Sequence, residues 1–293
     1  MTLKQRLRGS FLAPLIRRGI RLYWLTVGFP RFFRSWSLDR LSRHAYHRLS
    51  EAELRAARRS DTVFICGTGA SLRSITPEEW ARIGEHDVFS FRDFPRQTFV
   101  RADFHMSGEI DVLDEYAAAI NANPRYAGAK FLVQEGWEAW MCNLLIGKRK
   151  LRADAPVFRY RRTARGKMAP PSERFADGVV HGGGSVVSAT NIALMLGWKR
   201  IVFVGIDLYD HRYFYMPPDQ TRAVEKKGVD HTNPFSSGDF IVEQLGAWAV
   251  WGRSRGIELL CYNPRSLLTR RLPVFGWDTP PHPSTDQSEG ASI

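Results

Sequence analysis

The chain has 293 residues, of which 44% are hydrophobic, so it is not a disordered chain; we expect one large α/β domain with insertions or two small domains. Its 42 Lys and Arg against 30 Asp and Glu give a formal net charge of +12. This favours an anionic partner, which could be nucleic acid, a membrane surface or a phosphorylated substrate. Without a CxxC or HxxxH pair we expect no zinc site, and Cys66 and Cys261 lie in apolar runs typical of reduced core cysteines.

Residues 1–60 differ from the rest because arginines alternate with aromatic and aliphatic residues. Apolar residues recur there at helical spacing, at Leu12, Leu15, Ile16, Ile20 and Tyr23. This pattern is typical of an interfacial helix on anionic lipid, although a helix packed on its own domain is the alternative. The apolar run at residues 22–29 is too short to span a bilayer. We therefore expect a cytoplasmic protein that lies peripherally at the inner membrane through residues 1–60.

After Asp61 the pattern changes to that of a buried strand, TVFICG, which leads into the turn GTGASL. A buried strand followed by a glycine turn is how nucleotide-binding α/β folds begin, with the backbone of Gly67 and Gly69 close to the ligand. The turn lacks the third glycine of the dinucleotide fingerprint and the GK[ST] of a P-loop. NAD-binding and ATP-hydrolysing functions are therefore disfavoured.

Strand-like and helix-like segments then alternate. A helix is expected to begin after Thr76, with Pro77 in its first turn and Glu79 placed for a capping box. Further strands are expected at residues 87–94, 102–108, 129–135, 201–205 and 257–264, and helices at residues 111–119 and 239–253. This order predicts one α/β catalytic domain, residues 61–275, built on a doubly wound, mainly parallel Rossmann-like sheet with helices on both faces.

Two segments interrupt or follow this alternation. Residues 148–178 are rich in Lys and Arg and contain Pro170 and Pro171, so we expect a mobile insertion or flexible lid there. Residues 276–293 have the composition of a disordered tail.

Residues 179–218 contain a small-residue turn, an apolar helix, a strand and a polar loop in succession. The turn from His181 to Ser185 lets backbone N–H groups approach an anion at the start of the helix. The strand is followed by polar residues at Asp207, Tyr209, His211, Tyr213 and Tyr215. Because α/β proteins usually bind ligands at the carboxyl ends of buried strands, we expect the ligand site here, with Asp207 orienting the loop.

Across residues 61–275 these segments resemble the bacterial sialyltransferases of glycosyltransferase family 42. The similar motifs occur in the family's order: GTGASL, DVFSFRDF, GGGSVVSATNIALMLGWKRIVFVGIDLY, DHTNPFSSGDFIVEQL and IELLCYNPRSLL. The resemblance implies a CMP-sugar donor, inversion at the sugar carbon, no metal or other cofactor, and a variant single-sheet nucleotide-binding fold with a flexible lid.

The resemblance also implies roles for individual residues. Tyr209 and Tyr215 match the two tyrosines that hold the departing phosphate, and His231 matches the general-base histidine. Ser185 matches a serine near the donor phosphate. The turns that border the nucleotide would contribute Gly67, Thr68, Gly69, Ser71, Gly183 and Gly184.

The sequence departs from the family at the nucleoside contacts. Asparagines of the family fall near Thr68, Arg92 and Ser107, so contacts to the base and ribose must differ. The family's arginine before the glycine turn falls at Gly182. His181, or an arginine of residues 148–167, is the expected replacement.

The residue chemistry agrees with these roles. Phenol hydroxyls can stabilise the anionic phosphate of departing CMP, and a histidine can remove the acceptor's proton. We expect a membrane-associated sialyltransferase-like enzyme that transfers sialic acid or a related acidic sugar to a surface glycan or glycolipid, as in lipopolysaccharide or capsule biosynthesis. The alternatives are a nucleotide-dependent pyrophosphokinase or phosphotransferase of a related family with a GxGxSL start, and a catalytically silent interaction protein in glycan assembly. Nucleic acid is not an expected partner, and a homo-oligomer stays open.

Overall fold

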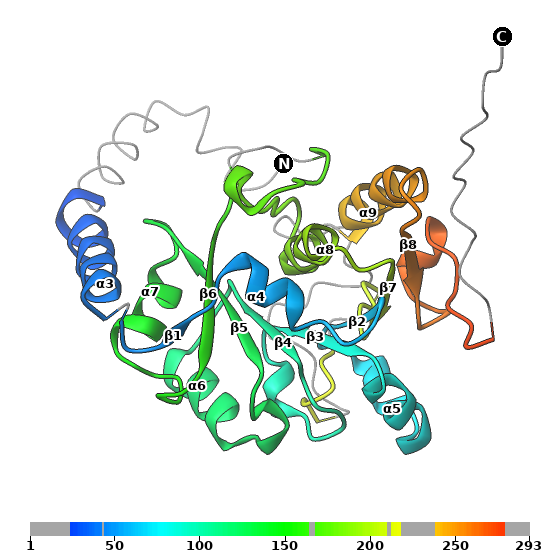
Figure 1. Ribbon diagram of the computed structural model, residues 1–293, viewed down its shortest axis with the longest axis horizontal. Helices are drawn as coiled ribbons and strands as arrows, with labels where there is room; N and C mark the ends of the chain where they lie inside the picture. Colours follow the sequence, from blue (N-terminus) through cyan, green and yellow to red (C-terminus); the bar gives the residue numbers. More distant parts are fainter. Residues whose placement is uncertain (1–23, 43, 164–167, 210–211, 218–237, 279–293) are drawn as a thin grey trace, which may run out of the picture.

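The computed structural model describes residues 24–42, 44–163, 168–209, 212–217 and 238–278 (Figure 1). Its centre is an eight-stranded sheet in the order β1-β6-β5-β4-β3-β2-β7-β8, and every pair of neighbours is parallel. The strands are β1 (His47–Arg48), β2 (Thr62–Cys66), β3 (Asp87–Phe91), β4 (Phe104–Ser107), β5 (Lys130–Glu135), β6 (Pro156–Arg161), β7 (Arg200–Val204) and β8 (Glu258–Cys261). The predicted single, parallel Rossmann-like sheet is therefore confirmed.

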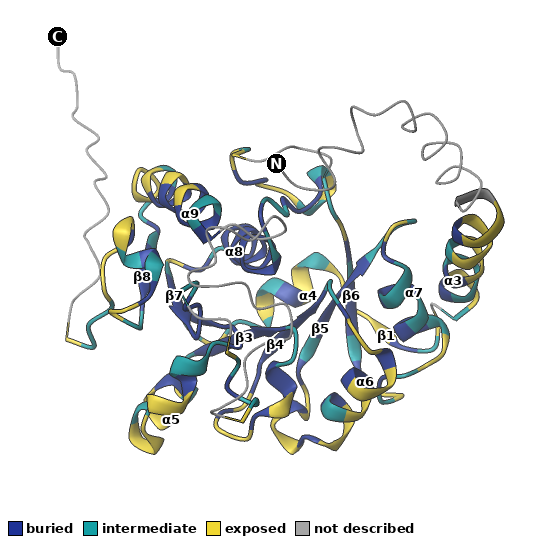
Figure 2. Ribbon diagram, turned by 180° about the vertical axis from the view of Figure 1, so that it is seen from behind, coloured by how far each residue is buried: buried dark blue, intermediate teal, exposed yellow. Residues whose placement is uncertain are grey.

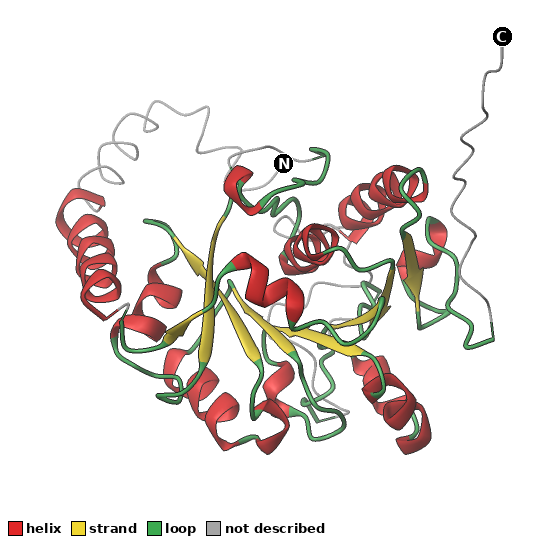
Figure 3. Ribbon diagram, viewed as in Figure 1, coloured by secondary structure: helices red, strands yellow, loops and turns green. Residues whose placement is uncertain are grey.

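Helices cover both faces of this sheet, as Figure 3 shows. One face carries α4 (Glu51–Ala56), α8 (Ser185–Leu196) and α9 (Gly238–Arg253), and the other carries α5 (Pro77–Gly84), α6 (Leu113–Ala122) and α7 (Trp140–Gly147). At one edge, α3 (Phe29–Ser42) follows the π-helical turn η1 (Trp24–Gly28) and packs on α7. Short 3-10 helices are η2 (Ala70–Ser74), η3 (Phe94–Arg96), η4 (Pro124–Tyr126), η5 (Phe175–Asp177) and η7 (Leu267–Arg270).

Local sequence explains the best-defined elements. The Thr76 side chain accepts a hydrogen bond from the Glu79 backbone N–H at 3.2 Å, while the Thr76 N–H donates to the Glu79 carboxylate at 2.8 Å, which is the predicted capping box. All of α8 is buried (Figure 2), because it lies between the sheet and α9. It ends at Gly197, whose φ of +88° is the left-handed conformation that glycine adopts easily.

The predicted lid over residues 148–178 is wrong for Pro156–Arg161, which form strand β6 between β1 and β5. The arginines of this strand made it look like a surface segment. In the structure, Arg161 pairs with Glu135 of β5 at 2.9 Å and Arg159 is itself buried against Asp39 at 2.9 Å. Residues 164–167 of the expected lid lie outside the described residues.

The predicted domain start at residue 61 is also too late. Strand β1 and helix α4 precede it, and both belong to the sheet and its core. Helix α3 packs against α7 so closely that a Cβ on Gly147 would lie 2.7 Å from the Leu38 Cβ. The packed-helix alternative therefore applies to residues 29–42, whereas residues 1–23 lie outside the description. None of the described helices is both long enough and apolar enough to cross a bilayer.

Asp87 provides a test of the sheet's framework. It is fully buried and accepts hydrogen bonds from the backbone N–H groups of Arg59 and Ser60 and from Trp198 Nε1 at 2.8 Å. Asp87→Ala leaves these buried donors unpaired, so we expect unfolding in urea to show a loss of about 3 kcal/mol. The control Asp114→Ala removes an exposed ion pair with Lys150 and should change the stability little. Equal losses in the two variants would contradict this role.

Candidate active site

The sheet order reverses between β2 and β7, which is where the crevice of an open α/β sheet is expected. From β2 the chain builds β3, β4, β5 and β6 outward in one direction, then returns to place β7 on the other side of β2. In open α/β sheets, ligands bind outside the carboxyl ends of the strands at such a reversal. The predicted turn at residues 67–71 and the predicted loop from Asp207 follow these two strands. The structure therefore brings these two segments together, as expected.

The two turns touch closely because Gly67 and Gly69 have no side chains. The Gly69 N–H donates to the Gly205 carbonyl at 2.8 Å. A Cβ on Gly67 would lie 2.3 Å from Ile206 Cδ1, and one on Gly69 would lie 2.4 Å from Asp207 Oδ2. These glycines are thus required for packing of the β2 turn against the β7 turn, whatever else they contact.

Asp207 connects the segments that follow β2, β7 and β8. Its buried carboxylate accepts hydrogen bonds from the Ser71 hydroxyl at 2.5 Å and the Ser71 N–H at 3.0 Å. Asn263, which follows β8, donates to Asp207 at 3.0 Å and lies 3.4 Å from the Tyr209 hydroxyl. These contacts are those of a residue that orients the loop. The sequence analysis missed Asn263, whose only signal is its position after a strand.

The loop that follows Asp207 and carries Tyr209, Tyr213 and Tyr215 (the tyrosine loop) is hydrogen-bonded to the turn at residues 67–71 after β2 (the β2 turn). The Phe214 N–H donates to the Thr68 carbonyl at 3.0 Å, and Tyr213 forms a β-bridge with Gly69. Thr68 contacts the loop through its backbone carbonyl, and the residue as a whole is largely buried. Residues 210–211 of the loop, including His211, lie outside the description.

The two proposed phosphate-binding tyrosines face different partners. The Tyr215 hydroxyl donates to Asp93, after β3, at 3.3 Å, and Arg96 lies over its ring at 5.2 Å. Tyr209 instead faces Asn263 after β8. Burial, together with the charge of Asp93, raises the pKa of Tyr215. Its hydroxyl therefore stays protonated at neutral pH and can donate a hydrogen bond. The third residue with a proposed role in the reaction, His231, lies outside the described residues.

Glu109, after β4, gathers three of the predicted residues although the sequence analysis did not single it out. It accepts hydrogen bonds from the Arg92 guanidinium at 2.9 Å and the Ser185 hydroxyl at 2.7 Å. The Nε2 atom of His181 lies 3.2 Å from its other oxygen. Three segments that are distant in sequence thus converge on one carboxylate, and a lone Glu in a loop carries no sequence signal for this.

The cluster keeps Glu109 ionised. Its partial burial alone would raise its pKa, but the hydrogen bonds from His181 and Ser185 and the charge of Arg92 outweigh burial and hold the pKa far below its usual range. The other ring nitrogen of His181, Nδ1, lies 3.0 Å from the Ser188 hydroxyl. The imidazole is therefore held from both sides, in an orientation set by Glu109 and Ser188.

Beside Glu109 lies a group of polar atoms with free hydrogen-bonding capacity. Four buried atoms there lack hydrogen-bond partners among the described residues: the Tyr160 hydroxyl, Arg162 Nε and Nη2, and Gln134 Oε1. They surround Gly108: a Cβ there would lie 2.8 Å from the Tyr160 hydroxyl and 3.1 Å from Arg162 Nη2. Because buried polar groups normally have partners, a ligand group or ordered water belongs here. Arg162 is an arginine of residues 148–167, the region expected to replace the family's arginine, and it lies 3.9 Å from Glu109.

Other predicted residues are placed differently. Ser107 is buried, and its hydroxyl lies 2.6 Å from the hydroxyl of Tyr116 on α6, which also bonds His105 at 2.6 Å. Strand alternation thus points the Ser107 side chain into the core, contrary to its expected nucleoside contact. Burial lowers the pKa of His105 to about 3, so this network is neutral.

The glycine turn before α8 is constrained by packing. A Cβ on Gly183 would lie 2.7 Å from Phe240 of α9, and Gly184 directly precedes the helix. Gly182 has a φ of +53°, a conformation that an arginine would adopt only with strain. No group of three or more His, Cys, Asp or Glu side chains that could hold a metal ion occurs in the part of the chain described.

The chain has a distant structural likeness to a known protein. No protein-family model matches the chain, and a search of curated proteins finds no match. Among solved structures, the chain is similar to the MAf glycosyltransferase from Magnetospirillum magneticum AMB-1, with 20% sequence identity and a TM-score of 0.46. The similarity covers 70% of this chain and 32% of that chain, so this chain spans about a third of the other's length. Such a likeness assigns no activity.

The charge cluster predicts a pH-dependent stability. Because its pKa is lowered on folding, Glu109 stabilises the fold fully above its unfolded pKa of about 4.5, and this contribution is lost as the pH falls toward the lowered value. Glu109→Gln should therefore lower the free energy of unfolding by about 1–2 kcal/mol at pH 7, with a difference from wild type that shrinks below pH 4.5. The control Glu115→Gln, which removes an exposed pair with Arg96, should have little effect at either pH. A Glu109 difference that is constant with pH would contradict this account.

Proposed function

We propose that the protein is an inverting glycosyltransferase that moves sialic acid or a related acidic sugar from a CMP donor to a surface glycan or glycolipid, without a metal ion. The observation that carries this proposal is the meeting of two segments at the reversal between β2 and β7. They are the turn at residues 67–71 and the loop that begins at Asp207, which are the segments that resemble the donor-binding motifs of family 42.

In the proposed reaction, the acceptor hydroxyl attacks the sugar carbon as the bond to the CMP phosphate breaks. His231 takes the acceptor's proton, and the hydroxyls of Tyr209 and Tyr215 donate to the departing phosphate. The raised pKa of Tyr215 supports its role as a donor, since a phenolate could not donate. Both hydroxyls must reach one phosphate, which requires Tyr215 to leave Asp93 when the donor binds.

The polar groups around Gly108 support the proposal that the transferred sugar is acidic. A carboxylate accepts hydrogen bonds well from a guanidinium and a phenol, and Arg162 and Tyr160 hold such donors without partners among the described residues. Glu109 neutralises part of the nearby positive charge. The proposed sugar carboxylate would lie at Gly108, with the nucleotide at the β2 turn.

Association with the inner face of the membrane is part of the proposal. It is supported by the net charge of +12 and by the basic and aromatic residues 1–60. In the described part of this segment, Phe29 and Phe33 are about half exposed on α3.

The first test is CMP release from a panel of CMP-activated sugars. We expect wild type to release CMP from at least one acidic-sugar donor, and His231→Ala to lower kcat by about 10²–10⁴-fold because the general base is lost. His47→Ala is the control, since His47 is exposed at the far edge of the sheet. If wild type releases CMP from none of the sugars in the panel, the donor assignment is wrong. If wild type and His231→Ala release CMP at equal rates, His231 is not the general base. Turnover that needs ATP and magnesium would favour phosphotransfer instead.

The second test removes single hydroxyls. Tyr209→Phe and Tyr215→Phe should each lower kcat for CMP release by about 10²–10³-fold, because each removes a donor to the developing phosphate charge. Tyr46→Phe is the matched control: its hydroxyl accepts from the Leu151 N–H at 3.1 Å, remote from the crevice. If all three variants retain the wild-type rate, the tyrosines do not stabilise the leaving group.

A further inference from the structure

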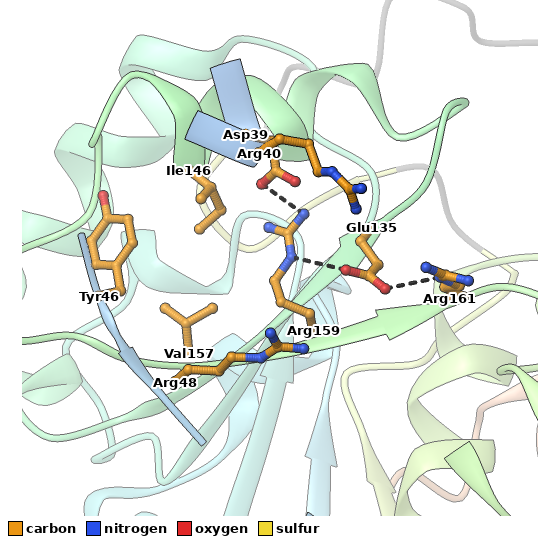
Figure 4. A pocket seen from close by; sticks show the side chains of 9 residues that line it. All are labelled: Asp39, Arg40, Tyr46, Arg48, Glu135, Ile146, Val157, Arg159 and Arg161. Carbon is orange, nitrogen blue, oxygen red and sulfur yellow. Dashed lines mark hydrogen bonds and ion pairs between the residues drawn. The ribbon is translucent and has the colours of Figure 1, made fainter. Parts of the chain in front are cut away.

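A polar cavity lies at the β1 edge of the sheet, beside β6 (Figure 4). Its volume is about 130 Å³, and residues from α3, β1, β5, β6 and α7 line it. Strand β1 pairs only with Pro156 and Val157, so the rest of β6 has no strand beside it on this side. The side chains of Arg159 and Arg161 enter this space from β6.

The cavity carries surplus positive charge. Its lining includes four arginines, Arg40, Arg48, Arg159 and Arg161, but only two carboxylates, Asp39 and Glu135. Asp39 pairs with Arg159 at 2.9 Å, and Glu135 pairs with Arg161 at 2.9 Å. In the described part of the chain, no carboxylate is paired with Arg40 or Arg48. Two cationic side chains therefore remain uncompensated at the cavity wall.

Arg159 keeps one unused donor although Asp39 lies 2.9 Å from its Nη2 atom and Glu135 lies 3.8 Å from its Nε atom. Its side chain is only 9% exposed, and its Nη1 atom has no hydrogen-bond partner among the described residues. In Figure 4 the guanidinium groups of Arg40 and Arg48 lie on either side of Arg159. A buried N–H without an acceptor is costly, so an oxyanion that enters the cavity would meet the free Arg159 Nη1 donor and the exposed guanidinium groups of Arg40 and Arg48.

The size of the cavity limits what can enter it. Pockets for drug-sized ligands measure about 300–1,000 Å³. The cavity, at about 130 Å³, is smaller than these and suits a small anion better than a whole sugar nucleotide. Guanidinium groups match phosphoryl oxygens in shape and charge, and the remainder of a phosphoryl compound would lie outside.

Helix α3 indicates where that remainder would lie. Along it, the rings of Phe29 and Phe33 are 6.2 Å apart and those of Phe33 and Trp36 are 6.1 Å apart, while Arg40 lies over Trp36 at 5.1 Å. This aromatic row therefore leads to a cavity-lining arginine. Phe29 and Phe33 are 53% and 50% exposed, and exposed aromatic rings beside cationic groups suit a membrane interface.

We propose that this cavity binds the phosphoryl headgroup of a membrane lipid, with the aromatic row of α3 in the lipid interface. The site is separate from the crevice between β2 and β7 and depends on no step of the proposed sugar transfer. It would orient the molecule on the membrane through a specific contact, in addition to the general attraction of its net charge.

The test is flotation of the full chain with phosphatidylcholine vesicles that do or do not contain phosphatidic acid. We expect wild type to bind the vesicles with phosphatidic acid, and the double variant Arg40→Gln, Arg48→Gln to bind them at least about tenfold more weakly, since two basic contacts are lost. The control double variant Arg125→Gln, Arg253→Gln has the same net charge and changes exposed residues of η4 and α9; it should bind nearly as wild type does. Equal weakening in both double variants would overturn the site.

A second arm separates the lipid from a soluble phosphoryl compound. Inorganic pyrophosphate is titrated into wild type and both double variants by calorimetry, without vesicles. Weak binding by wild type that only Arg40→Gln, Arg48→Gln abolishes supports the phosphoryl site. If pyrophosphate binds in this way but no vesicle does, the lipid source is overturned. If neither probe distinguishes the two double variants, the cavity is no phosphoryl site.

Discussion

The close contact between the turns after β2 and β7 is the constraint on which the candidate active site depends. It exists only because Gly67 and Gly69 leave room for the Gly205 carbonyl and the Asp207 carboxylate. Asp207 then fixes Ser71 on one side and, through Asn263, the start of the tyrosine loop on the other. A single buried carboxylate thus joins the segments that follow β2, β7 and β8.

A second carboxylate, Glu109, organises the neighbouring strand ends. Its carboxylate oxygens contact three polar side chains, those of Arg92, His181 and Ser185, and hold them close together. Strand β6 links this cluster to the outer cavity. Arg162 follows the strand and keeps free N–H groups near Gly108, whereas Arg159 within the strand keeps one at the cavity beside α3. Strand β6 and the residue after it therefore place arginine N–H groups without hydrogen-bond partners at two separate positions in the fold.

Most of the sheet could be predicted because six of its strands, β2, β3, β4, β5, β7 and β8, are short segments rich in apolar residues and bounded by turn residues. The capping box at Thr76 could be predicted because it depends on residues only three apart. Strand β6 was missed because Arg159 and Arg161 interrupt its apolar pattern. Their charges are matched by Asp39 and Glu135, which come from other elements and are invisible in a local window.

The sequence alone predicts the alternation of strands and helices and the positions of the turns at Gly67, Gly69 and Asp207, because periodicity and glycine placement act over a few residues. It also identified Arg92, His181 and Ser185 as polar residues at element ends. Only the tertiary structure decided that these three meet at Glu109, that the Ser107 side chain points into the core, and that Tyr209 and Tyr215 face different partners. Such outcomes depend on which strand ends become neighbours and on which side chains neutralise one another, and both are settled by packing across the whole sheet.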